Sequence, residues 1–196
     1  MNEKYFLSKF HLPWSAGPSL DFPFPVKTRP AAVLICLQPP LENLQVLFTQ
    51  RASHLNHHAG QISFPGGKYE TSDDSLVQTA LREAEEEIGL SSDKVRILGT
   101  LPEYKTISGF AVLPVIGILD ETLDLEIDLT IDENEVSRVF QVPLSHLMNQ
   151  QNYFVHHVER RKQSFPVYFI QYQNDLIWGA TAGMTALLCK HVEFYS

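Results

Sequence analysis

The chain has 196 residues, of which 44% are hydrophobic, and its 15 Lys and Arg against 23 Asp and Glu give a net charge of −8. This length and composition predict one folded domain and exclude a mainly disordered or fibrous chain. The acidic balance argues against nucleic-acid and anionic-membrane partners, which are bound by basic patches, but it is compatible with an anionic small-molecule substrate if acidic side chains carry metal ions.

The first predicted segment is an extended N-terminal arm over residues 1–29, ahead of a domain over residues 30–196. Prolines disfavour regular structure in the arm and at its end; they are Pro13, Pro18, Pro23, Pro25 and Pro30. The arm has no apolar stretch of signal-peptide length, so we expect a cytoplasmic protein. Residues 31–37 and 44–51 follow as apolar, strand-like runs, and a hairpin is indicated by the turn residues between them, Pro39, Pro40 and Asn43.

Further strands and helices are interspersed along the rest of the chain. Strands are expected over residues 110–119 and 165–172, and a strand-like run ends at Pro143, where a short helix follows. Longer helices are predicted over residues 75–89 and 178–192. Because this order lacks a regular βαβ alternation, it predicts an α+β fold with a mixed, layered sheet.

The helix over residues 75–89 carries the most informative pattern. Ser75 followed by Gln78 is a capping-box signature, and Gly89 marks the end of the helix. An apolar stripe of helical spacing consists of Val77, Leu81, Ala84 and Ile88. At about 100° of rotation per residue, three carboxylates gather on another face; they belong to Glu83, Glu86 and Glu87.

Three like charges within one helical turn repel one another, the more so where solvent is excluded. Arg82 is the only basic residue of this helix that could relieve the repulsion. A divalent cation would turn the repulsion into binding, because Mg²⁺ takes carboxylate oxygens and shares them with substrate phosphates. The spacing therefore favours a metal site, with a solvated acidic face as the alternative.

Gly67 and residues 82–90 resemble the Nudix box, written G-x5-E-x7-R-E-U-x-E-E-x-G-U with U aliphatic. Residues 82–90 agree with the second half of the motif at every fixed position. The first half departs in two ways, since an Asp stands where the motif has Glu and the loop is one residue longer. Counting from Gly67 reaches Asp73, whereas counting back from the Arg of the motif reaches Asp74, so either can be the early acid.

A second motif, over residues 47–67, is similar to the signature of Nudix enzymes that hydrolyse coenzyme A, approximately L-L-T-x-R-[SA]-x3-R-x3-G-x3-F-P-G-G. The positions in register are Arg51, Gly60, Phe64, Pro65, Gly66 and Gly67. Asn56 stands where the pattern has Arg, and the longer box loop is expected in this subfamily. The two motifs are contiguous, and the resemblance extends from the strand at residue 31 to the last predicted helix.

The resemblance implies an α/β/α sandwich with a mixed sheet, in which the box forms a catalytic loop–helix–loop. It implies Mg²⁺ or Mn²⁺ bound by Glu83, Glu86, Glu87 and the carbonyl of Gly67. Arg82 is expected to orient a neighbouring glutamate, or else to be a surface partner of Glu86. A further catalytic acid is expected at Glu135, with Glu133 as the other candidate. The implied substrate-binding residues are Arg51, Gly60, Gln61, Phe64, Gly66 and Gly67.

The implied activity is hydrolysis of the pyrophosphate bond of coenzyme A or its thioesters, which yields 3′,5′-ADP and (acyl-)4′-phosphopantetheine. Asn56 keeps open the same chemistry on another nucleoside diphosphate derivative, such as ADP-ribose, NADH or a damaged nucleotide. A Nudix-fold ligand-binding module without catalysis is disfavoured, because such modules usually lose a box glutamate and this chain keeps all three. We expect a small-molecule substrate and neither a nucleic-acid nor a membrane partner.

Overall fold

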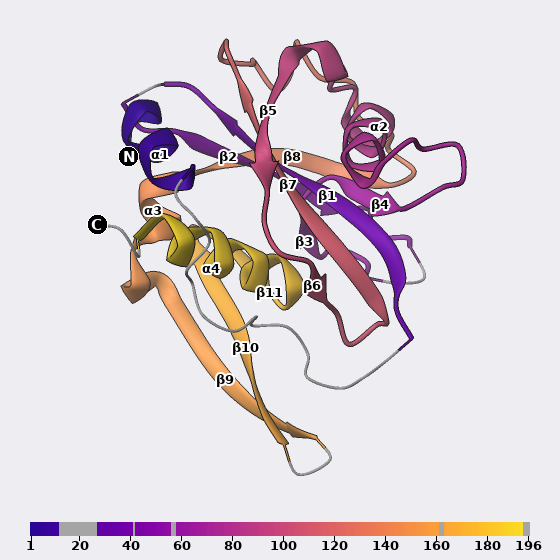
Figure 1. Ribbon diagram of the computed structural model, residues 1–196. Coiled ribbons are helices and arrows are strands. Elements are labelled where there is room, and N and C mark those ends of the chain that lie inside the picture. Colours follow the sequence, from indigo (N-terminus) through magenta and orange to yellow (C-terminus); the bar gives the residue numbers. More distant parts are fainter. Residues whose placement is uncertain (12–26, 41, 56–57, 161–162, 194–196) are drawn as a thin grey trace.

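The computed structural model describes residues 1–11, 27–40, 42–55, 58–160 and 163–193 (Figure 1). An eight-stranded mixed sheet forms the middle layer. Helix α2 (Leu76–Ile88) covers one face of this sheet. A three-stranded antiparallel sheet and three further helices cover the other face; these helices are α1 (Glu3–Phe10), α3 (Leu144–Met148) and α4 (Ala180–Glu193).

The large sheet is built around two long parallel strands, β1 (Arg29–Gln38) and β7 (Phe110–Leu119), which run in register from the pair Arg29–Phe110 to the pair Leu37–Ile118. The other strands pair antiparallel with their neighbours. They are β2 (Gln45–Arg51), β3 (Ile62–Ser63), β4 (Gly66–Lys68), β5 (Val95–Thr100), β6 (Tyr104–Lys105) and β8 (Val136–Pro143). Single 3-10 turns precede β5 and follow α3 at η1 (Ser92–Lys94) and η2 (Gln150–Asn152).

Strand β1 changes its antiparallel partner along its length. Its end pairs with β2 at Leu37 and Gln38, whereas its beginning pairs with β4 over Ala31–Val33. Beyond that point β2 pairs with β3 at Thr49 and Gln50, while its other edge pairs with β8 from Gln45 to Arg51. The sheet is therefore divided between β3 and β4, and the residues of the two sequence motifs lie at this division.

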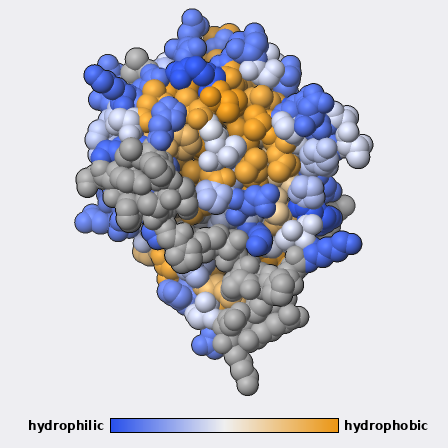
Figure 2. Space-filling view, in the orientation of Figure 1, coloured by the Kyte–Doolittle hydropathy of each residue, from blue (hydrophilic) through white to orange (hydrophobic). Residues whose placement is uncertain are grey.

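Alternation along β1 supplies apolar side chains to both layers, as expected for a strand that is covered on both faces. Ala32, Leu34 and Cys36 are fully buried towards α2. Ile35 and Leu37 are fully buried towards α4 and the small sheet. Figure 2 shows an apolar area on one face of the molecule, in the region where Figure 1 places β5, whose side chains Ile97 and Leu98 are half-buried.

The three-stranded sheet consists of β9 (Tyr153–Arg160), β10 (Gln163–Tyr172) and β11 (Asp175–Trp178). Ile170 and Ile177 are fully buried in the core that includes α4. Trp178 is 42% exposed and stacks on Phe169, with ring centroids 6.2 Å apart. None of the helices in the described ranges is long and apolar enough to cross a lipid bilayer.

The structure confirms the α+β class, the strands expected within residues 31–37, 44–51, 110–119 and 165–172, and the helices at residues 75–89 and after Pro143. The last helix begins at Ala180, because Trp178 ends β11 and Gly179 adopts a φ of +67°.

The prediction of an extended arm is wrong for residues 3–10, which form α1. The side chain of Asn2 accepts a hydrogen bond from the Tyr5 amide at 2.8 Å, and this N-cap starts the helix. Phe6 and Phe10 are buried in the core that includes α4. Residues 12–26, the greater part of the predicted arm, lie outside the described residues.

Candidate active site

Helix α2 is fixed at both ends as its sequence predicts. The Ser75 hydroxyl accepts a hydrogen bond from the Gln78 amide at 3.2 Å, while the Gln78 side chain accepts one from the Asp74 amide at 2.6 Å. Gly89 ends the helix with a φ of 69°. Ala84 and Ile88 are buried against the sheet, and this sets the rotation of the helix about its axis.

Strand β4 brings a pair of glycines beside two of the box glutamates. The Gly66 amide donates a hydrogen bond to Glu87 Oε2 at 3.2 Å. A Cβ atom added at Gly67 would lie within 2.3 Å of Glu83 Oε1, so the Glu83 carboxylate occupies the space that a side chain at position 67 would need. The close approach of the Glu83 carboxylate to the backbone therefore favours glycine at position 67, whereas a Cβ at Gly66 would meet the Ala32 carbonyl oxygen and Val33 of β1.

Arg82 ties the same loop to three carboxylates. Its Nε lies 2.9 Å from Asp73 Oδ1, its Nη1 lies 2.8 Å from Glu86 Oε2, and its Nη2 lies 3.0 Å from Glu83 Oε1. Nη2 also donates to the carbonyl oxygen of Lys68 at 3.2 Å. Arg82 is thus more than a surface partner of Glu86, because its planar fork orients Glu83 and anchors β4.

Asp73, rather than Asp74, is the buried acid of the loop. Asp73 is 4% exposed and accepts hydrogen bonds from the Thr79 hydroxyl at 2.8 Å and the Glu70 amide at 3.0 Å, in addition to the contact with Arg82. Hydrogen bonding to Arg82 holds the pKa of Asp73 well below its usual range. Asp74 is exposed. The longer loop is accommodated with Asp73 turned inwards.

Asp73→Asn is expected to lower the free energy of unfolding by on the order of 2 kcal/mol, because it removes the charge that Arg82 pairs with. Asp74→Asn, one residue away and exposed, should change it by less than about 0.5 kcal/mol. Urea denaturation at pH 7 measures both. The difference should shrink progressively as the pH falls below about 4, since an acid with a lowered pKa contributes its full stabilisation only above its unfolded-state pKa and loses it as the pH approaches its folded-state pKa. Equal effects of the two substitutions would contradict the assignment.

Glu87 is the most deeply buried carboxylate of the helix, with 3% of its surface exposed. Burial raises the pKa of Glu87 to about 8, with a further upward contribution from Glu83 and opposing ones from the Gly66 amide and from Arg51, whose Nη1 lies 3.8 Å from Glu87 Oε1. Burial also raises the pKa of Glu83, although the charge of Arg82 and its hydrogen bond to Glu83 act to lower it. The charge of Glu135, on the segment before β8, contributes to both upward shifts.

The loop that carries the upstream motif closes at its base next to these carboxylates. The Arg51 amide donates to the Gln61 carbonyl at 2.9 Å, and the Gly60 amide donates to the Arg51 carbonyl at 3.2 Å. The Ala52 amide donates to the Glu135 carbonyl at 2.8 Å, which joins the loop to the segment before β8. The side chain of Gln61 is paired with His58 Nδ1 at 2.7 Å.

Two positions of the upstream motif, Phe64 and Asn56, are not among the residues that the structure places at the candidate active site. Phe64 is buried and stacks on Phe48, with centroids 4.8 Å apart, so it lies in the core that includes α4 and not on a ligand-accessible surface. Asn56 lies outside the described residues.

The predicted metal ligands are only partly brought together. Glu83 and Glu87 lie at the Gly66–Gly67 backbone, whereas the Glu86 side chain is 59% exposed and is held by Arg82. Among the described residues, no three His, Cys, Asp or Glu side chains are already grouped as a cation site. The arrangement still fits a hard divalent cation, because carboxylate oxygens and a backbone carbonyl are its preferred ligands and Glu87 is a buried acid with incomplete charge compensation.

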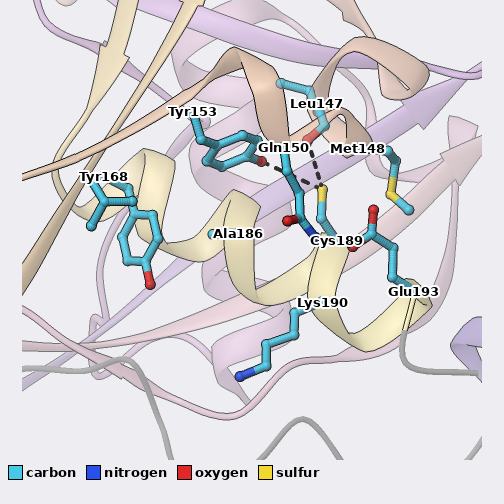
Figure 3. Close-up of a pocket in the computed structure, with 10 residues that line it drawn as sticks. Leu147, Met148, Gln150, Tyr153, Tyr168, Ala186, Cys189, Lys190 and Glu193 are labelled. Atoms are coloured by element: carbon cyan, nitrogen blue, oxygen red, sulfur yellow. Dashed lines mark hydrogen bonds between the residues drawn. The ribbon is translucent and has the colours of Figure 1, made fainter.

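A cavity of about 340 Å³ lies elsewhere, between α3, η2, β9, β10 and α4 (Figure 3). At its wall, the Tyr153 hydroxyl donates to Cys189 Sγ at 3.7 Å, and Cys189 Sγ lies 3.4 Å from the Leu147 carbonyl oxygen. Burial raises the pKa of the Cys189 thiol to about 12, which makes it a poor nucleophile. The cavity contains none of the predicted site residues.

Comparison with known protein families shows which family has this fold and this box motif. Residues 27–162 match the model of the NUDIX domain, which covers most of the chain. The chain belongs to the Nudix hydrolase family. It is therefore a hydrolase of acid anhydrides that acts on a nucleoside diphosphate derivative, and Nudix hydrolases generally use divalent metal ions such as Mg²⁺ or Mn²⁺.

Similar Nudix proteins cover nearly the whole chain. A protein named "Uncharacterized Nudix hydrolase NudL" from Photorhabdus laumondii subsp. laumondii is 40% identical over 168 residues, which are 84% of this chain and 86% of that one. A protein of the same name from Citrobacter koseri is 38% identical over 95% of this chain and 93% of its own. The crystal structure of the Nudix hydrolase RenU from M. smegmatis shares the fold, with a TM-score of 0.50 and 23% identity over 63% of this chain and 74% of that chain.

Proposed function

We propose that this Nudix hydrolase cleaves the pyrophosphate bond of coenzyme A or its thioesters and releases 3′,5′-ADP and (acyl-)4′-phosphopantetheine. The observation that carries this proposal is the position of the upstream motif. Arg51 ends β2 beside Glu87, and the loop from Arg51 to Gln61 closes on itself at the box. This supports the proposal, because Arg51 and the Gly66–Gly67 pair of the coenzyme A signature lie beside the box glutamates that would meet a substrate pyrophosphate.

Mg²⁺ or Mn²⁺ would be held by Glu83, Glu86, Glu87 and the carbonyl of Gly67. Glu86 would have to exchange its contact with Arg82 for the ion, which its exposed position permits. When bound, such ions neutralise charge on the pyrophosphate and lower the pKa of a bound water. The donor set consists of oxygens alone, which suits these cations better than Zn²⁺.

The protein's own side chains then have separate tasks. Arg51 is positioned to bind a phosphate oxygen through its guanidinium, part of which is exposed. Arg82 holds Glu83 against Gly67, so that the carboxylate needs little reorganisation. The proton of the attacking water passes to a box carboxylate or to Glu135, whose charge acts on both Glu83 and Glu87.

The test is hydrolysis of coenzyme A, acetyl-coenzyme A, dephospho-coenzyme A, ADP-ribose and NADH with Mg²⁺ or Mn²⁺, followed by chromatographic separation of the products. We expect release of 3′,5′-ADP from coenzyme A in clear preference to cleavage of the other compounds. Preference for ADP-ribose or NADH would reject coenzyme A as the substrate and keep the Nudix chemistry. Cleavage of none of them, with tight binding of one, would favour a ligand-binding module.

A further inference from the structure

Basic side chains gather at the end of the large sheet where β1 and β7 begin. Arg29 is the first residue of β1, Lys68 is the last residue of β4, and Lys105 ends β6. The strands β4, β1, β7 and β6 lie side by side at this end (Figure 1). This local concentration of cations stands out in a chain whose net charge is −8.

Arg29 and Lys68 share one face of the sheet. Lys68 is directly opposite Ala31 on β1, and Arg29 is two residues before Ala31, so the two cations are diagonal neighbours. Ala31 belongs to the core that includes α4, whereas Gly67 faces Glu83 on α2. Since side chains alternate along a strand, Lys68 and Arg29 lie on the face opposite to α2.

This face is within reach of a ligand that is bound at the box. Lys68 directly follows Gly67, and β4 pairs only with β1 among the described strands, so its other edge is not covered by a neighbouring strand. A long substrate that contacts Gly67 and Glu83 can pass around this edge and reach Lys68. The Lys68 carbonyl accepts a hydrogen bond from Arg82, which fixes the strand relative to the box.

The backbone and one side chain of this pair are held in place. The Arg29 amide donates to the Gly109 carbonyl at 3.0 Å, and the Tyr69 amide donates to the Pro30 carbonyl at 3.1 Å. The Arg29 guanidinium lies 4.2 Å from the centroid of the Phe110 ring, a cation–π contact that restricts its movement. Arg29 and Lys68 are exposed, and within the described ranges neither forms an ion pair with an acidic side chain.

We propose that Arg29 and Lys68 form a subsite for a phosphate monoester, and that in coenzyme A this group is the 3′-phosphate of the adenosine. The proposal rests on the proposed function and extends it to the part of the substrate that distinguishes coenzyme A from dephospho-coenzyme A. A phosphate monoester carries close to two negative charges, so two adjacent cations, one of them a guanidinium fork, match it. Binding there supplies specificity and leaves the hydrolytic step to the box.

The experiment measures binding of 3′,5′-ADP and of AMP to the full chain by calorimetry, because these nucleotides differ only in the 3′-phosphate. We expect 3′,5′-ADP to bind to the wild type at least about tenfold more tightly than AMP. Arg29→Gln and Lys68→Gln should each remove most of that difference. The affinity for AMP should change by less than about twofold in either variant. Lys94→Gln, an exposed lysine in the turn before β5, is the matched control and should change neither affinity. Arg29→Lys and Lys68→Arg should preserve most of the preference.

Steady-state kinetics separates this proposal from the proposed function. The glutamine variants should raise KM for coenzyme A by about tenfold, with kcat and the KM for dephospho-coenzyme A nearly unchanged. Equal affinity of the wild type for 3′,5′-ADP and AMP, or an equal loss for both nucleotides in the variants, would overturn the subsite even if coenzyme A is cleaved. A preference for 3′,5′-ADP that depends on Arg29 and Lys68 would support the subsite even if coenzyme A proves not to be cleaved.

Discussion

Glu87→Gln is expected to reduce turnover by about 10²–10⁴-fold, the usual weight of one charge-stabilising or acid–base group, and to make the metal-free protein more stable at alkaline pH. Both effects follow from burial. The Glu87 carboxylate is 3% exposed, and among the described residues its partners are the Gly66 amide and Arg51, at 3.8 Å. A buried charge with so little compensation is costly in the absence of a cation.

The sign of the pH dependence follows from the pKa of Glu87, which burial raises from 4.5 to about 8. Between these values the unfolded chain is ionised while the folded one keeps its proton, so this group makes the protein progressively less stable as the pH rises. At about 1.4 kcal/mol per pKa unit, Glu87→Gln should raise the free energy of unfolding by on the order of 2–4 kcal/mol at pH 8 in the presence of a chelator, and by much less at pH 5.

Glu86→Gln is the matched comparison, because the Glu86 side chain is 59% exposed. We expect it to lose turnover by a similar factor if it binds the ion, but without the alkaline gain in stability. Mg²⁺ should stabilise the wild type more at pH 8 than at pH 6, and should stabilise the Glu87→Gln variant weakly. Near-wild-type turnover in either variant, with the fold intact, would reject the proposed ligand set.

Gly67→Ala is expected to fold normally and to lose activity by about 10²-fold or more. The added Cβ would lie 2.3–2.5 Å from the carboxylate atoms of Glu83, and this carboxylate is the end of a flexible side chain. The backbone at Gly67 has no positive φ that would exclude alanine. The Glu83 side chain can therefore move aside at little cost in stability, but it would leave the position that Arg82 and β4 give it.

The neighbouring glycine supplies the control. A Cβ at Gly66 would lie 2.4 Å from the Ala32 carbonyl oxygen and 2.6 Å from the Val33 Cα, and Gly66 has a φ of +156°. Gly66→Ala should therefore destabilise the β1–β4 pairing itself and lower the melting temperature, whereas Gly67→Ala should not. Thermal denaturation followed by circular dichroism, together with turnover of the preferred substrate, distinguishes the two outcomes. An active Gly67→Ala variant would show that Glu83 does not need its observed position.

The parts of the structure that depend on local pattern could be predicted from the sequence. The capping residues Ser75 and Gly89 determine the ends of α2, and the apolar run of residues 110–119 coincides with β7. The box glutamates were identifiable because their spacing on a helix is unusual and because the motif around them is specific. Their location beside Gly66 and Gly67 also follows from that motif.

Features that depend on contacts between distant residues could not be predicted. The choice of Asp73 over Asp74 requires the positions of Thr79 and Arg82, and counting along a loop does not give them. The burial of Glu87 depends on β4, a strand of three residues with two glycines and no strand-like pattern. Likewise α1 is short, and its stability comes from packing of Phe6 and Phe10 into a core that forms only with α4.

Under the proposed function, the divided pairing of β1 keeps the segment that would recognise the substrate outside the β1–β7 ladder that holds the box. The β1–β7 ladder and α2 fix the box, while Arg51 at the end of β2 is joined to Gly60 and Gln61 by hydrogen bonds outside that ladder. We therefore expect a change of length or sequence between Arg51 and Gln61 to alter which molecule is cleaved while the box keeps its geometry. Exchange of this segment with that of a relative is accordingly a practical way to redesign substrate choice.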